Sequence, residues 1–151
     1  MKSLLFFLTL LLTACSLTSA GQTKTIAGKV ICTDFPSKHN STDHAFWNAS
    51  GAVIFGNDSI RLGTADENGE FEFEIPKDIR TLRIGWVGMD PEQFELTGNC
   101  DFLEVILLPG VYYEFMTVKK EKRLRKKDRK VLPALYQEAV EQKIFKQKVL
   151  N

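Results

Sequence analysis

Residues 64–75 read TADENGEFEFEI, and this stretch decides the fold. Apolar and acidic side chains alternate strictly from Glu70 to Ile75, which is the period-two pattern of a strand with one buried face. An Asn-Gly pair at 68–69 precedes the alternation and is typical of a tight turn. Pro76 follows it and ends the strand. The stretch therefore predicts a turn that leads into a strand whose glutamates face water.

The five carboxylates of this stretch also allow a metal-binding or catalytic interpretation. A calcium loop places oxygen ligands at spaced positions before a glutamate, and residues 66–69 (DENG) fall two residues short of that spacing. A hydrolase needs two acids held across a cleft, whereas the glutamates of 70–74 would stand about 7 Å apart on one exposed face. A turn with a solvated sheet face is the favoured interpretation.

Short alternating runs recur as far as residue 116, separated by turn signals and without a helical period. A long polar loop is expected over 34–51, and residues 111–118 form either a further strand or a bridge to the tail. The expected strands cover 25–33, two runs around the turn at 56–58, 70–75, 81–88, 93–96 and 102–109. This pattern predicts a mainly β fold, a seven-stranded β-sandwich.

Four segments in order resemble the carboxypeptidase regulatory-like domain: IAGKV (26–30), GAVI (51–54), GTADENGEF (63–71) and LRIGWVGM (82–89). The resemblance implies a transthyretin-like, immunoglobulin-like sandwich over residues 25–116. It also implies a non-catalytic accessory module without a cofactor. The chain departs from the family in its longer first loop and in Met89, where an aromatic residue is common. It also lacks the C-terminal Tyr-Arg-Gly-Ser of the transthyretin-like hydrolases.

The first 14 residues, with one Lys and an apolar run from Leu4 to Leu12, predict a secretory signal too short to span a bilayer. Residues 12–15 (LTAC) look like a bacterial lipobox, which would make Cys15 the acylated N-terminus and 15–24 a tether. The alternative is cleavage after Ala20 with Cys15 discarded. The expected location is the bacterial cell envelope, at the outer membrane, facing the periplasm or the cell surface.

Charge divides the chain into an acidic body and a basic tail. Residues 3–116 carry 7 Lys and Arg against 15 Asp and Glu, and residues 117–151 carry 12 against 4. Apolar residues recur at helical spacing over 132–150, which predicts an amphipathic helix that tolerates Pro133 in its first turn. The basic run comprises Lys119, Lys120, Lys122, Arg123, Arg125, Lys126, Lys127, Arg129 and Lys130.

Three interpretations of the basic run remain open. It binds anionic lipid headgroups, or it is a solvated helix start that folds back on the acidic body, or it binds nucleic acid. Nucleic acid is the least favoured, because a secreted protein rarely meets it. We expect the tail to be separable from the sandwich, and to dock a partner or the membrane.

Few residues of the sequence are candidates for a metal site, a ligand contact or a disulfide. His39, Asp43 and His44 in the long loop would supply a metal site, as the alternative in which the chain is a metal-dependent binder or hydrolase. Phe46 and Trp47 in the same loop are candidate contacts for a protein or glycan partner. Cys32 and Cys100 either form one disulfide or are two buried thiols. The favoured function is a non-catalytic lipoprotein that binds an envelope protein or glycan.

Overall fold

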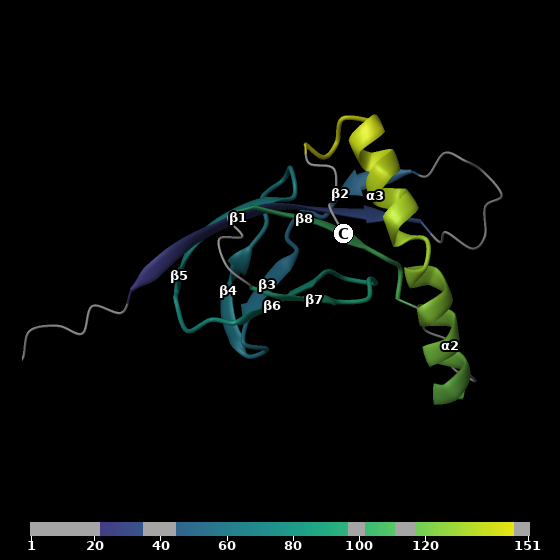
Figure 1. The fold of residues 1–151 in the computed structure, drawn as a ribbon, viewed down its shortest axis with the longest axis horizontal. Helices are drawn as coiled ribbons and strands as arrows, with labels where there is room; N and C mark the ends of the chain where they lie inside the picture. The colour runs from purple at the N-terminus through teal and green to yellow at the C-terminus, as the bar shows by residue number, and fades with distance from the viewer. Residues whose placement is uncertain (1–21, 35–44, 97–101, 111–116, 147–151) are drawn as a thin grey trace, which may run out of the picture.

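In a computed structural model, the described residues are 22–34, 45–96, 102–110 and 117–146. Two four-stranded sheets lie face to face, and two helices follow them in the chain (Figure 1). The fold is therefore mainly β with a C-terminal helical segment, as predicted. The elements are β1 Thr23–Thr33, β2 Phe46–Asn48, β3 Val53–Gly56, β4 Ile60–Thr64, β5 Glu70–Pro76, β6 Thr81–Gly85, β7 Glu92–Glu95, β8 Phe102–Leu107, α2 Val118–Arg129 and α3 Leu132–Glu141.

The first sheet is built around the long strand β1. On one side, β5 pairs antiparallel with residues 23–29 and β2 with residues 31–33; on the other side, β8 runs parallel to residues 27–32. β1 begins at Thr23 rather than at the predicted residue 25, because residues 23 and 24 pair with Pro76 and Ile75. The predicted long loop contains one short strand, β2, which makes eight strands in the described residues instead of the expected seven.

The second sheet has the order β4-β3-β6-β7 and is antiparallel throughout. The predicted hairpin around residues 56–58 is confirmed. Asn57 and Asp58 both have positive φ, at 46° and 64°, and the twist of such a turn matches that of the strands it joins. The Asn57 side-chain oxygen accepts hydrogen bonds from the backbone N–H groups of Arg80 and Thr81, which ties the hairpin to β6.

One core fills the space between the sheets. Alternation on β1, β5 and β6 places alternate side chains inward, as predicted from the period of two, and the facing strands β3 and β8 contribute the rest. The residues with the deepest burial include Ile26, Val30 and Cys32 on β1, Ile54 on β3, Ile75 on β5, Leu82 and Ile84 on β6, and Val105 and Leu107 on β8.

The DENG segment forms the predicted turn. A side-chain oxygen of Asp66 accepts hydrogen bonds from the N–H groups of Asn68 and Glu70, both at 2.8 Å. Gly69 has φ +74°, and a Cβ there would collide with the carbonyl oxygen of Val30. The Val30 N–H in turn donates to the Gly69 carbonyl oxygen at 2.8 Å. The turn therefore packs directly on β1, where the partner of that strand changes from β5 to β2.

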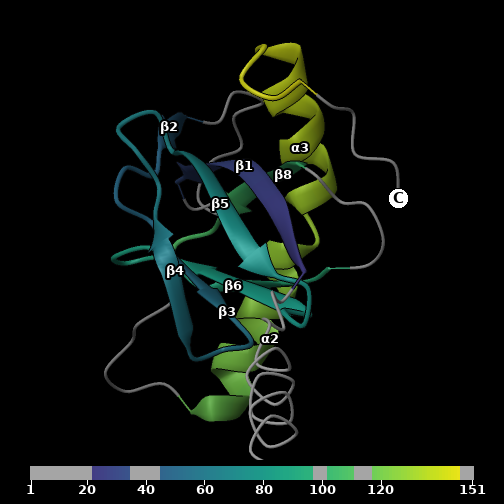
Figure 2. The same cartoon turned by 90° about the vertical axis from the view of Figure 1, so that its left-hand side faces the viewer.

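The outer face of the first sheet carries a second core. Ile31, Ile106 and Leu108 from the sheet are buried against α3 and the residues that follow it, which lie along β8 in both views (Figures 1 and 2). The contributing tail residues are Leu135, Ala139 and Phe145, with Tyr136, Val140 and Ile144 partly buried around them. The C-terminal segment is thus packed against the first sheet. Whether the sandwich folds without this segment stays a prediction.

The helices also differ from the expected single helix over 132–150. The basic run itself is helical, as α2, and α3 ends at Glu141. Lys143 adopts a left-handed conformation with φ 61°, and the N–H groups of Ile144 and Phe145 bond the Ala139 carbonyl oxygen. This reversal folds Phe145 back onto the second core. Pro133 lies in the first turn of α3, as predicted.

Candidate functional site

An apolar groove of about 610 Å³ lies on the outer face of the second sheet. β3 and β6 form its floor, and the segments before β3 and after β6 form its walls. Its lining residues are Ser50, Gly51, Val53, Phe55, Arg83, Gly85, Trp86, Val87, Met89 and Pro91. Apolar side chains dominate this set, with a single charged residue among them.

Strand alternation explains the floor of the groove. Ile54 points into the core, so its neighbours Val53 and Phe55 face outward, and Gly85 occupies the matching outward position of β6. Because Gly85 has no side chain, the space above the sheet stays open. The continuous apolar run at 52–55 is the sequence signal for a strand that is apolar on both faces, whereas a period of two alone predicts one apolar face.

Trp86 forms one wall of the groove. Its indole N–H donates to the Ser50 carbonyl oxygen at 2.7 Å, which fixes the ring. One part of the side chain packs against the main core, and the other part lines the groove. The adjacent Val87 is 89% exposed, an unusual position for a β-branched apolar side chain.

Arg83 provides the only charge among the groove residues. Its guanidinium lies 5.2 Å from the centre of the Phe55 ring, a cation–π geometry, and Nη2 donates to the Asp58 carbonyl oxygen at 3.4 Å. These contacts hold the arginine at the groove, and within the described ranges no carboxylate forms an ion pair with it. The groove can therefore receive an apolar group that stands next to an anion.

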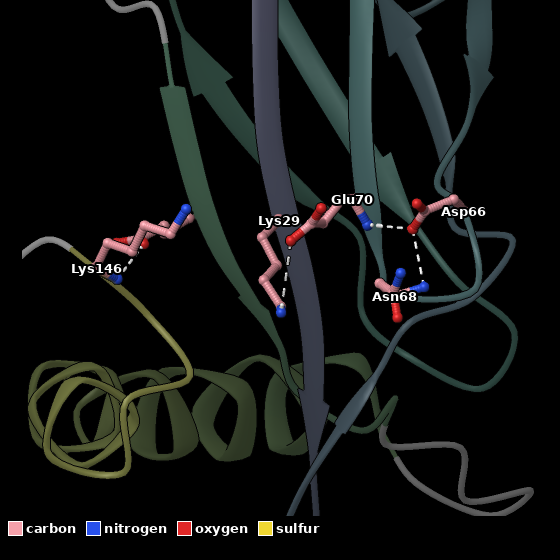
Figure 3. Close-up of polar contacts among 6 residues, drawn as sticks. Lys29, Asp66, Asn68, Glu70 and Lys146 are labelled. Atoms are coloured by element: carbon pink, nitrogen blue, oxygen red, sulfur yellow. Dashed lines mark hydrogen bonds and ion pairs between the residues drawn. The ribbon is translucent and has the colours of Figure 1, made fainter.

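A second, polar groove of about 680 Å³ lies on the outer face of the first sheet (Figure 3). Lys29 projects from β1 between the facing positions of β5 and β8, and its Nζ is 3.8 Å from a Glu70 oxygen. A Glu104 oxygen accepts a hydrogen bond from the Lys146 backbone N–H. Glu70 thus contacts a lysine, and Asp66 and Glu104 accept hydrogen bonds from backbone N–H groups, as is usual on a solvated sheet face.

The described residues contain no group of three His, Cys, Asp or Glu side chains placed to hold a metal ion. Glu70, Glu72 and Glu74 are all exposed and alternate with the partly or fully buried Phe71, Phe73 and Ile75, as predicted. The alternative metal residues His39, Asp43 and His44 lie outside the described residues. That interpretation therefore stays a prediction.

The candidate pair Phe46 and Trp47 does not form one surface. The two residues are neighbours on β2, so their side chains point to opposite faces of the sheet. Phe46 packs against the second core beside Ile31, whereas Trp47 is 38% exposed and pairs in register with Cys32. Of this pair, Trp47 is the one exposed enough to contact a partner.

Cys32 is a free, fully buried thiol in the structure, and burial raises its pKa to about 12. A thiol in such surroundings acts as a small apolar side chain with little nucleophilic character. Its possible disulfide partner Cys100 lies outside the described residues, as does the proposed lipidation site Cys15.

The basic run folds back on the acidic body. Arg125 lies 3.1 Å from Asp90 and 2.8 Å from Glu121, and Arg129 lies 2.9 Å from Glu92. Burial raises the pKa of both Asp90 and Glu92, and the nearby arginines oppose the shift. The pairs with Asp90 and Glu92 attach α2 to the segment between β6 and β7 and to the first residue of β7. The carboxylates that hold the helix are thus not those of the DENG stretch.

No protein-family model and no curated protein sequence matches this chain. The resemblance to the carboxypeptidase regulatory-like domain therefore rests on the four sequence segments alone. Among the described helices, none has the length and apolar character needed to cross a membrane.

Proposed function

We propose that this chain is a non-catalytic binding module of a bacterial envelope lipoprotein, held at the membrane by lipid on Cys15. The fold proposed for it is the transthyretin-like sandwich of the carboxypeptidase regulatory-like domains. Its partner is a protein, and the contact surface is the apolar groove between Trp86 and Phe55. The groove is the observation that carries the proposal.

The chemistry of the groove defines the ligand. Val53, Phe55 and Val87 form an apolar surface in contact with water. Burying an aliphatic or aromatic side chain against it lowers the free energy of the complex. Arg83 stands beside this surface with its guanidinium over the Phe55 ring, which suits a carboxylate. The fitting partner is therefore a peptide segment with an apolar residue next to an acidic one.

A glycan partner has less support. Sugar binding by aromatic residues uses exposed ring faces, and the predicted pair is divided between two faces of the sheet. The groove lining consists mainly of apolar and glycine positions, which offer few hydrogen-bonding groups to sugar hydroxyls.

A photoreactive phenylalanine derivative in place of Val87, in the full chain in the envelope, tests the proposal. We expect a discrete protein adduct at position 87 and none from the same substitution at Val118, an exposed apolar residue on α2. The adduct partner, once purified, should bind the chain with one-to-one stoichiometry. Arg83→Gln should weaken that binding by roughly tenfold, and Lys29→Gln on the polar face should not.

Equal adducts at both positions, or binding insensitive to Arg83→Gln, would contradict the assignment of the groove.

The lipid anchor is tested separately. Cys15→Ser should lose the mass of the acyl chains and leave the membrane fraction. If the variant keeps both, the lipoprotein assignment is wrong, whatever the groove binds.

A further inference from the structure

Helix α2 sorts its charges onto two faces. Residues 119, 122, 123, 126, 127 and 130 recur at spacings of three and four, which places them along one side of the helix. Lys120 adjoins this stripe. The seven side chains are all exposed, and none has an ion-pair partner among the residues that the structure describes: Lys119, Lys120, Lys122, Arg123, Lys126, Lys127 and Lys130.

The opposite side of α2 faces the protein. Its two acidic residues, Glu121 and Asp128, lie on this side with Arg125, and Asp128 is buried. The ion pairs from Arg125 to Asp90 and from Arg129 to Glu92 fix the rotation of the helix about its axis. The outward stripe, which we call the cationic face, is consequently presented to solvent without an interleaved carboxylate.

Much of the cationic face interacts unfavourably with the helix that carries it, although Lys126 and Lys127 in the last turn suit the negative end of the helix dipole. Like charges at i,i+4, such as Lys119 with Arg123 and Lys122 with Lys126, repel each other. Lys119 and Lys120 lie in the first turn, where the helix dipole disfavours cations, and Thr117 makes no side-chain capping bond. An external negative surface would relieve the repulsion between the cations and their unfavourable interaction with the dipole. The fold therefore accounts for only part of this charge distribution, and an anionic ligand would account for the rest.

We infer that the cationic face of α2 binds the anionic headgroups of a lipid membrane. The seven cations lie along a helix about 18 Å long, with no aromatic side chain among them to stack on a nucleic-acid base. The one large apolar side chain that α2 exposes is Val118 at its first position. A single valine inserts little apolar surface below the headgroups, so the contact is mainly electrostatic and superficial. The choice of a membrane as the anion source rests on the proposed lipid anchor.

The position of α2 suits this role. In Figure 1, α2 and the start of β1, which follows the proposed tether, lie at opposite ends of the long axis. A lipid anchor at one end and a headgroup contact at the other would hold the sandwich in one orientation on the membrane. The apolar groove belongs to the second sheet, so a fixed orientation would also determine which way the groove faces.

Vesicle binding by the full chain tests the inference. The probes are vesicles of phosphatidylcholine alone and of phosphatidylcholine with phosphatidylglycerol, and the variant replaces Lys119, Lys122, Arg123 and Lys126 with Gln. We expect the preference for anionic vesicles to fall by at least about tenfold. The matched control replaces Lys24, Arg61, Lys77 and Arg80 with Gln, which removes the same charge from the sandwich, and should retain the preference.

A measurement without substitutions guards against misfolding of the variant. Acylation of surface lysines in the wild-type chain, read by mass spectrometry, should show the α2 lysines protected by anionic vesicles and Lys77 unprotected. High salt should abolish the protection. Binding of the Gln variant equal to wild type, no protection of α2, or tighter binding to a nucleic-acid duplex at the same salt would each overturn the inference.

The same titration with Cys15→Ser separates this inference from the proposed anchor. If Cys15→Ser still prefers anionic vesicles but is no longer found in the membrane fraction of cells, both proposals stand. If Cys15→Ser, which carries no acyl chain, associates with membranes in cells as well as the wild type does, the anchor proposal is wrong. The headgroup contact is then retained. Loss of anionic preference in the α2 variant alone supports the cationic face independently of the anchor.

Discussion

The Tyr136 hydroxyl donates a hydrogen bond to the Glu104 carbonyl oxygen at 3.1 Å and accepts one from the Ile106 N–H at 3.3 Å. These two backbone groups lie on the side of β8 that faces away from β1. A tyrosine from α3 therefore occupies the hydrogen-bonding groups through which another strand would pair. Burial raises the Tyr136 pKa to about 12, so the hydroxyl stays protonated as a donor. α3 thus covers an edge as well as a face of the sheet.

Tyr136→Phe should lower the free energy of unfolding by about 1–3 kcal/mol, because it leaves a carbonyl and an N–H of β8 without their partner. Urea denaturation measures the change, and hydrogen exchange should show the Ile106 amide exchanging faster. Gln137→Ala, on the exposed side of the same helix, should change stability by less than about 0.5 kcal/mol. Equal effects of the two substitutions would contradict the edge-capping role.

Leu135→Ala should cost about 2–5 kcal/mol, since Leu135 is fully buried between α3 and the first sheet. A separable tail would predict no effect on the unfolding of the sandwich. Thermal unfolding followed by near-ultraviolet circular dichroism measures the sheet core directly. A single transition shifted to lower temperature is expected, and an unchanged sandwich transition would support the separable-tail prediction instead.

Alanine substitutions at Gly69 and Gly88 allow a matched comparison that tests the packing of the DENG turn on β1. Both have positive φ, +74° and +78°, but a Cβ at 69 would meet the Val30 carbonyl oxygen, whereas a Cβ at 88 meets nothing within 4 Å. Gly88→Ala should cost only the backbone strain, about 1 kcal/mol. Gly69→Ala should cost clearly more, because β1 must shift as well. Chemical denaturation of both variants measures the two losses in free energy of unfolding. Equal losses would show that the close approach of Gly69 to β1 is unimportant.

Arg125→Met should make stability strongly pH-dependent. The pKa of Asp90 is already raised by desolvation, and Arg125 is the largest influence that lowers it. Without Arg125, Asp90 would bind a proton at still higher pH in the folded state than in the unfolded state. Stability should therefore fall as pH rises through the folded pKa and recover as pH decreases.

The loss at about pH 8 should be roughly 2–3 kcal/mol, from an uncompensated buried carboxylate, and should shrink at about pH 5. Urea denaturation at the two pH values measures it. Adding Asp90→Asn to Arg125→Met removes the buried charge and should restore most of the lost stability at high pH. A loss that is the same at both pH values, or that Asp90→Asn fails to restore, would exclude this electrostatic account.

Cys32 should resist alkylation in the native protein. With its pKa raised to about 12, only about one thiol in 10,000 is ionised at about pH 8, and the side chain is buried. Denaturation without a reductant separates the two predictions for the cysteines. Labelling of both Cys32 and Cys100 would show two thiols, and labelling of both only after reduction would show that they pair.

Structural features that depend on interactions between residues close together in the chain were predictable from the sequence. The DENG turn needs Asp66 to bond two nearby N–H groups and Gly69 to adopt positive φ, and both follow from the residue types. The alternation of EFEFEI determined which side chains of β5 face the core. The hairpin at 56–58 and the position of Pro133 are of the same kind.

Contacts between distant segments were decided only by the tertiary structure. Sequence periodicity specifies which face of a strand is apolar, but not which element covers it. The parallel pairing of β8 with β1, the cover that α3 provides over Ile31, and the division of Phe46 from Trp47 all depend on such choices. The basic run was visible as composition, yet its division into a paired inner side and a cationic outer face required the position of Asp90 and Glu92.

The sequence alone determined turns, strand faces and net charge, because these depend on near neighbours. The packing of the sheets determined the groove and the cationic face, because both arise where residues far apart in the chain meet.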